Sequence, residues 1–187
     1  MPNPAFIVEG HMEKKIAGKL CPGQPVRRIG CNGDNVEIAR MCDFIASHIR
    51  IFSNKYYPIF IIFDREKRVD SRETLRARML QELECRGFGD QDIRVFIADR
   101  EFEDWYLLDI EGICNHYGLI SLRIRGSGKH AISNLIGQKQ QYIETSTGVE
   151  IFDIIDKQKV GAACGEFNAM ISAATEIGCS ALQAQLL

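Results

Sequence analysis

The sequence predicts an α/β fold, in which a parallel sheet of about four strands is flanked by helices and followed by a C-terminal helical extension. Continuous apolar runs of strand length, as at residues 5–8 and 59–63, predict buried strands. Segments with a helical spacing of apolar residues separate these runs, and such alternation is typical of right-handed βαβ units. The 187 residues are 45% hydrophobic, which is enough to bury a core.

The first predicted helix lies between two predicted strands. Residues 5–9 form the first strand and Gly10 the turn after it. The helix at 11–20 follows, because apolar residues recur in it at every fourth position. Pro22 breaks this helix, and residues 26–31 are expected to form a second, shorter strand.

Two longer helices flank the third strand, which covers residues 59–63. Turn-forming residues at 32–35 precede a helix at 36–51, whose apolar residues share one face. After the strand, Ser71 is the predicted cap of a charged amphipathic helix at 72–86. Four apolar residues of this helix are expected to face the core: Leu75, Met79, Leu80 and Leu83.

The fourth strand, at 93–98, leads into a helix that ends near Tyr117. Trp105 and Tyr106 in this helix are expected to be core residues. Beyond Gly118 the sequence predicts short helices at about 129–136, 149–158, 165–175 and 180–187. We therefore expect an α/β domain over residues 1–118 and a helical cap over residues 119–187.

Composition and charge restrict the function only weakly. The net charge of −2 does not by itself indicate a nucleic-acid-binding protein. The seven cysteines are odd in number and include no CxxC pair, which favours reduced, scattered thiols over a disulfide framework or a zinc site. No signal peptide and no apolar run near the ~20 residues of a membrane span is seen, so we expect a cytoplasmic protein without membrane contact.

Six carboxylates follow three of the predicted strands: Glu9 and Glu13 after the first, Asp64 and Glu66 after the third, and Glu101 and Glu103 after the fourth. The carboxyl ends of parallel strands meet at one edge of the sheet, so these side chains should converge. Like charges at close range raise one another's pKa and cost stability, and a divalent cation relieves the repulsion. Oxygen ligands of this kind suit Mg²⁺ or Mn²⁺, and two such ions support in-line attack on a phosphodiester.

Some of these residues have structural alternatives. Glu13 alone also fits a solvated helix position, and Glu103 rather than Glu101 is the expected working member of its pair. Basic residues adjoin the acids and suit contacts with substrate phosphates: Arg65, Arg68 and Arg100. His11, beside Glu9, fits a substrate contact or a surface position at a helix start equally well.

The order and spacing of these motifs resemble the Toprim domain. Val8-Glu9-Gly10 with Glu13, then Phe63-Asp64-Arg65-Glu66, resembles this Rossmann-like catalytic module of topoisomerases, bacterial primases and several nuclease families. Glu66 stands where that family has Asp. The stretch at 100–109 is similar to one in OLD-like nucleases and stand-alone Toprim proteins.

The resemblance implies a nuclease that hydrolyses phosphodiester bonds of DNA or RNA with Mg²⁺ or Mn²⁺. Its catalytic residues carried over to this chain are Glu9, Asp64, Glu66 and Lys129. It implies one ion held by Glu9, Glu13 and Asp64 and a second held by Asp64, Glu66 and Glu103. Lys129 stands in the position of a lysine that stabilises the transition state, although a surface lysine at a helix start is an alternative.

The resemblance also implies a bacterial or phage-defence context, with nucleic acid and sometimes an ATPase as partner. Two alternatives stay open: a non-catalytic module that binds nucleic acid or a partner ATPase, and a nucleotide phosphotransfer enzyme. The segment Gly126-Ser127-Gly128-Lys129 is not a P-loop, because Arg123 replaces the first glycine and His130 replaces Ser or Thr.

Overall fold

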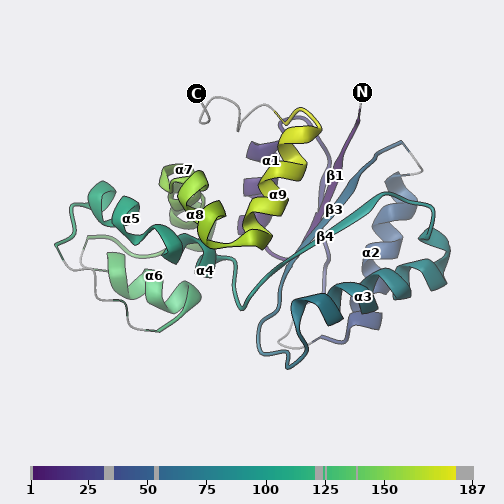
Figure 1. The fold of residues 1–187 in the computed structure, drawn as a ribbon, viewed down its shortest axis with the longest axis horizontal. Helices are drawn as coiled ribbons and strands as arrows, with labels where there is room; N and C mark the ends of the chain where they lie inside the picture. The colour runs from purple at the N-terminus through teal and green to yellow at the C-terminus, as the bar shows by residue number, and fades with distance from the viewer. Residues whose placement is uncertain are drawn as a thin grey trace.

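A parallel sheet forms the centre of the computed structural model, which describes residues 2–31, 36–52, 55–120, 124, 126–137 and 139–179 (Figure 1). The sheet has four strands in the order β2-β1-β3-β4. Their bounds are β1 Ala5–Val8, β2 Val26–Arg28, β3 Ile59–Asp64 and β4 Ile93–Ala98. The predicted α/β fold, with a parallel sheet flanked by helices, is confirmed.

The register of the strands brings their carboxyl ends to one edge. Val8 pairs with Ile62, and Asp64 pairs with Ala98. The central strands β1 and β3 are apolar and buried up to Val8 and Phe63, and β4 is buried over its last four residues, as a sheet covered on both faces requires. The polar residues that follow β1, β3 and β4 therefore start from neighbouring positions.

Helices cover both faces of the sheet. On one face, α2 (Ile38–Phe52) and α3 (Arg72–Leu83) pack against strand residues such as Ile7 and Ile61 (Figure 1). On the other face, α1 (His11–Leu20) and α9 (Gly165–Glu176) share a core with Phe6 and Phe60 (Figure 1). Successive strand side chains point to opposite faces, which explains the two separate cores.

The C-terminal helical extension packs on the face that carries α1. Its helices are α6 (Gly128–Ile136), α7 (Val149–Ile154), α8 (Lys157–Ala163) and α9, with a π-helical turn at Glu144–Gly148 before α7. Ile132, Phe152 and Phe167 of this extension join the same core as Phe6 of β1. Trp105 and Tyr106 are buried in this core, as predicted. The domain boundary after residue 118 stays a prediction.

Three predicted helices end early or are interrupted in the structure. The helix predicted at 72–86 begins after the Ser71 cap, as expected, but ends at Leu83 and is followed by a π-helical turn at Glu84–Phe88. Gly87 in this turn has φ 87°, which glycine adopts without strain. Leu80 is 37% exposed, so the prediction that it faces the core is wrong.

The other two helices, predicted after Ala98 and at 149–158, are each divided in the structure. The helix predicted after Ala98 is divided into α4 (Glu103–Tyr106) and α5 (Ile110–Tyr117), because the chain between them tightens into a 3₁₀ turn and Asp109 caps α5. The helix predicted at 149–158 is interrupted by extended backbone at Ile155. The turn predicted at 32–35 and the helix predicted at 180–187 lie outside the described residues.

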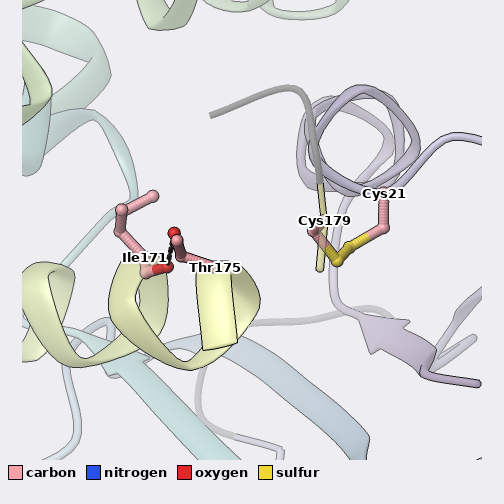
Figure 2. Close-up of a disulfide and its surroundings, with 4 residues drawn as sticks. All are labelled: Cys21, Ile171, Thr175 and Cys179. Atoms are coloured by element: carbon pink, nitrogen blue, oxygen red, sulfur yellow. Dashed lines mark hydrogen bonds between the residues drawn. A yellow bond between two sulfur atoms is a disulfide. The ribbon is translucent and has the colours of Figure 1, made fainter. Parts of the chain in front are cut away.

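A disulfide joins Cys21 to Cys179, so the prediction of scattered, unpaired cysteines is wrong for these two residues (Figure 2). Cys21 caps the end of α1, and Cys179 follows α9; their Cα atoms are 4.7 Å apart. Both side chains are buried in the core shared by α1 and α9. The two residues are 158 positions apart, and only the packing of both helices on one sheet face brings them together. Five described cysteines are free: Cys31, Cys42, Cys85, Cys114 and Cys164.

The outer edge of β4 is bonded to side chains from two helices. The Arg76 Nε of α3 donates to the Val95 carbonyl over 3.0 Å. A carboxylate oxygen of Glu166, in α9, accepts from the Ile97 N–H over 2.9 Å and also from Arg76. These bonds fix both helices to the sheet. In the part of the chain that the structure describes, no helix is long and apolar enough to cross a membrane.

Candidate active site

A cleft of about 720 Å³ lies at the carboxyl ends of the strands. Its carboxylates come from β3, from the segments after β1 and β4, and from the C-terminal extension: Glu13, Asp64, Glu66, Glu101, Glu103 and Glu144. Its basic residues are Arg65, Lys67, Arg68, Arg100 and Lys129. The predicted convergence of acids from three strand ends is therefore present in the structure.

Glu9 connects the ends of β1 and β3. Its Oε2 accepts a hydrogen bond from the Asp64 N–H over 2.9 Å. Burial raises the pKa of Glu9, and the charge of Glu66 adds to this, while the bond from Asp64 and the charge of Arg68 act in the opposite direction. The carboxylate of Glu9 is thus fixed directly beside Asp64, on the side of β1.

Glu13 is one of the two buried acids of the cleft as described, with 5% of its surface exposed against 4% for Glu103. Its Oε2 is buried and has no hydrogen-bond partner among the described residues. The carboxylate folds back over Gly10, where an added Cβ would meet Oε2 at 2.2 Å. Burial, followed by the charges of Glu103, Glu144 and Glu9, raises the pKa of Glu13 to about 7.

The loop after β3 holds Asp64 and Glu66 in a defined conformation. Glu66 has φ 53°, in the left-handed region that non-glycine residues rarely adopt. Two backbone bonds to the segment after β4 maintain it: Arg65 N–H to the Ala98 carbonyl over 3.0 Å, and Glu66 N–H to the Arg100 carbonyl over 2.8 Å. Burial and the surrounding acids, Glu13 first among them, raise the pKa of Asp64 well above its usual value.

The Arg68 side chain stabilises the loop that carries Asp64 and Glu66. Its guanidinium donates to the carbonyls of Asp64 over 2.9 Å and Val36 over 3.1 Å, and lies 3.6 Å from Glu66. Only 7% of its side chain is exposed, so most of its donors serve the protein itself. Arg65 likewise donates to the Asp99 carbonyl over 2.6 Å.

Arg100 and His11 have a different setting from these arginines. Arg100 is exposed at the cleft, and within the described chain its guanidinium has no hydrogen-bond or ion-pair partner. It is therefore the predicted phosphate contact that is most accessible to a ligand. His11 is exposed at the start of α1 and does not belong to the residues that line the cleft as described.

Glu101 and Asp104 close the N-terminus of α6. Glu101 Oε2 accepts from the Lys129 N–H over 2.6 Å, and Asp104 Oδ1 accepts from the Gly128 N–H over 2.7 Å. A Cβ at residue 128 would overlap Glu101, so glycine is required there. Two carboxylates thus occupy the helix end where a P-loop binds phosphate. Glu101 is engaged as a cap, whereas Glu103 makes no such contact with α6 in the described structure.

Tyr142 and Glu144 of the C-terminal extension were not anticipated from the sequence. The Tyr142 hydroxyl donates to Glu103 Oε1 over 2.7 Å, and Lys129 Nζ forms an ion pair with Glu144. Burial lowers the pKa of Lys129, but its bond with Glu144 outweighs this effect and raises it overall. Burial also raises the pKa of Glu103, against the effect of the Tyr142 bond. No local motif identifies these two residues, because their partners are distant in sequence. Tyr142 is 39 positions from Glu103, and Glu144 is 15 positions from Lys129.

The donor set of the cleft fits a hard divalent cation by its chemistry. Mg²⁺ and Mn²⁺ prefer carboxylate oxygens, and the buried Glu13 Oε2 lacks any partner within the described residues. In the described parts of the chain, no three Asp, Glu, His or Cys side chains are already gathered as an ion would require. The acids surround a common space, and ion binding would need their side chains to turn toward it.

Comparison with known proteins adds no assignment: no family model, no curated protein and no solved structure matches this chain.

Proposed function

We propose that this protein is a metal-dependent nuclease that hydrolyses phosphodiester bonds of DNA or RNA. One observation carries the proposal: Glu13, Asp64, Glu66 and Glu103, from three strand ends, line one cleft, and the buried Glu13 Oε2 has no partner among the described residues. Such a concentration of acids costs stability, and clusters of this kind are typical of functional sites. The resemblance to Toprim nucleases identifies these four acids and also Glu9, which does not line the cleft as described but accepts a bond from the Asp64 N–H.

The proposed ligands of Mg²⁺ or Mn²⁺ are Glu9, Glu13, Asp64, Glu66 and Glu103. When bound, these ions supply charge neutralisation and a nucleophilic water at neutral pH. Glu9 is bonded to the Asp64 N–H and so keeps the acids of β1 and β3 adjacent. The left-handed backbone at Glu66 directs the second acid of this loop to the same cleft.

The basic residues at the cleft are proposed to bind the phosphates of the polymer. Arg100 is exposed and, in the described structure, unpaired, so it can contact a phosphate without breaking an existing bond. Lys129 is proposed to stabilise charge on the scissile phosphate, after exchanging its bond with Glu144 for one with the substrate. Arg68 keeps the Asp64–Glu66 loop in place through its carbonyl contacts.

Cleavage assays on single-stranded and double-stranded DNA, RNA and tRNA, with Mn²⁺ or Mg²⁺, test the proposal. The variants are Asp64→Asn and Glu13→Gln, which keep the side-chain shape and remove a charge. Asp70→Asn is the matched control, since Asp70 pairs with Arg78 and does not line the cleft in the described structure. We expect metal-dependent cleavage by wild type and the control, and its loss in both cleft variants.

Other outcomes separate this proposal from its alternatives. Cleavage that persists in both cleft variants contradicts it. Turnover of free nucleotides but not of polymers supports a phosphotransfer enzyme instead. Nucleic-acid binding without turnover, unchanged in Asp64→Asn, supports a non-catalytic module, and cleavage that appears only with an added ATPase identifies a partner-activated nuclease.

A further inference from the structure

A tyrosine from the C-terminal extension contacts one of the proposed metal ligands. We propose that Tyr142 is a positioning residue, which orients the carboxylate of Glu103 for cation binding. This inference rests on the proposed function and adds a residue that neither the strand-end motifs nor the resemblance includes. It also gives the C-terminal extension a direct part in the site.

The contact between the two side chains is well defined. The Tyr142 hydroxyl donates to Glu103 Oε1 over 2.7 Å. Glu103 is only 4% exposed, so water has little access to replace this donor. A hydrogen bond to a charged acceptor in such surroundings is stronger than one at the surface. The bond therefore fixes, through the Oε1 atom, the carboxylate of a residue that lines the cleft.

The position of the hydroxyl is itself enforced by packing. It lies 3.7 Å from the Met12 Sδ of α1. At Gly148, an added Cβ would come within 2.8 Å of the hydroxyl and within 2.3 Å of Met12 Sδ. The absence of a side chain at Gly148 thus makes the space that the phenol occupies. Glycine, methionine and tyrosine together determine where the hydroxyl lies.

The neutrality of the donor argues for a role beyond holding the fold together. A lysine or arginine on Glu103 would cancel the charge that attracts a cation. Tyrosine orients the carboxylate and leaves its charge intact, and Lys129, also at the cleft, pairs with Glu144 instead. Partners of this kind behind metal ligands typically change metal affinity by 10–100-fold when removed.

Mn²⁺ binding to the purified full chain, measured by calorimetry and by electron paramagnetic resonance, tests the inference without any need for turnover. The variant is Tyr142→Phe, and the control is Tyr117→Phe. Tyr117 is also half-buried, and its hydroxyl accepts a hydrogen bond from Gln140 Nε2 over 3.3 Å. It does not line the cleft in the described structure. We expect Tyr142→Phe to weaken Mn²⁺ binding about tenfold and the control to leave it unchanged.

Two further variants keep the result interpretable if Tyr142→Phe lowers the stability of the fold. Gly148→Ala keeps the hydroxyl but displaces it, and we expect it to weaken Mn²⁺ binding in the same way. Glu103→Gln with and without Tyr142→Phe forms a double-mutant cycle on thermal stability. A coupling between the two changes supports the bond in the absence of any metal, and its absence overturns the inference.

The failure of the inference and the failure of the proposed function give different results. If Tyr142→Phe and Gly148→Ala both bind Mn²⁺ as tightly as wild type does, the role of Tyr142 is overturned and the proposed metal-dependent nuclease is unaffected. A wild type that binds no Mn²⁺ overturns the proposed function and the positioning role together.

Discussion

The Glu9 carboxylate accepts a hydrogen bond from the backbone N–H of Asp64 over 2.9 Å, across the junction of β1 and β3. This bond uses one oxygen of Glu9 and binds the acid at one strand end to the acid at the next. The two residues are 55 positions apart in sequence. The geometry of the acidic site therefore depends on the register of the two strands.

Glu9→Gln separates the charge of this residue from its hydrogen bond. Glutamine keeps an oxygen that can accept from the Asp64 N–H, so we expect the fold and its melting temperature to be retained. We expect the metal-dependent cleavage rate to fall at least ~100-fold, because a charged ligand is lost. Cleavage assays with thermal unfolding of the same samples check this, and a fully active Glu9→Gln would remove Glu9 from the site.

The buried Glu13 predicts a stability that depends on pH. Its pKa in the folded protein is about 7, above the ordinary 4.5, so its ionisation is less favourable in the folded than in the unfolded state. The resulting loss of stability is absent below about pH 4.5, grows as the pH rises toward 7 and is complete above it. We expect Glu13→Gln to stabilise the metal-free protein by about 1–3 kcal/mol at pH 8 and by little at pH 4.

Urea unfolding at the two pH values, with a chelator present, measures this effect. The control is Glu37→Gln, since Glu37 is exposed and not part of the cleft in the described structure. A Glu13→Gln protein that gains no stability at pH 8 contradicts the raised pKa. Mn²⁺ added at pH 8 should stabilise wild type more than Glu13→Gln, because it binds the charged form.

The ion pair between Lys129 and Glu144 predicts unequal effects for its two members. Lys129→Met should lower the cleavage rate by about 100-fold, because it removes a cation proposed to act on the scissile phosphate. Glu144→Gln should have a much smaller effect on the maximal rate, since it only frees the lysine. Steady-state cleavage kinetics measure both, with Lys14→Met at an exposed position of α1 as control. Equal losses in the two variants would show that the pair acts as a structural unit.

The disulfide predicts a stability that depends on redox conditions. It closes a loop with a sequence separation of 158, and its removal by Cys21→Ser or Cys179→Ser should cost about 2–5 kcal/mol under oxidising conditions. With a reducing agent present, wild type should approach the variants. Thermal and urea unfolding measure this, and Cys85→Ser, at an exposed free cysteine, is the control. A wild type that is insensitive to the reducing agent would show that the bond does not form in solution.

The strands and the acids after them were predictable because the information is local. The run Ile59–Asp64 is a buried strand that stops at a carboxylate, and the parallel order of the sheet follows from the alternation of strands and helices. Once the sheet is parallel, Glu9 and Asp64 must lie at the same edge. This much of the fold and of the site needs no knowledge of distant contacts.

The remaining parts depend on contacts between distant segments. Tyr142 reaches Glu103 only because the C-terminal extension packs over α1, and nothing in its neighbourhood distinguishes it from a surface tyrosine. The sequence predicts Arg68 as a phosphate contact, but in the structure its guanidinium donates to the backbone carbonyls of Asp64 and Val36. Glu101 and Glu103 have equivalent spacing, and only the position of α6 assigns the first as a helix cap.

The bonds that Arg76 and Glu166 make with β4 also affect how molecules of this protein meet one another. An edge strand with open N–H and C=O groups is a template on which a strand of a second molecule can add. In β4 the outward carbonyl of Val95 and the outward N–H of Ile97 are already bonded to these two side chains. A strand from a neighbouring molecule would have to break this pair first, so the same contacts that secure α9 protect the sheet from intermolecular extension and aggregation at this edge.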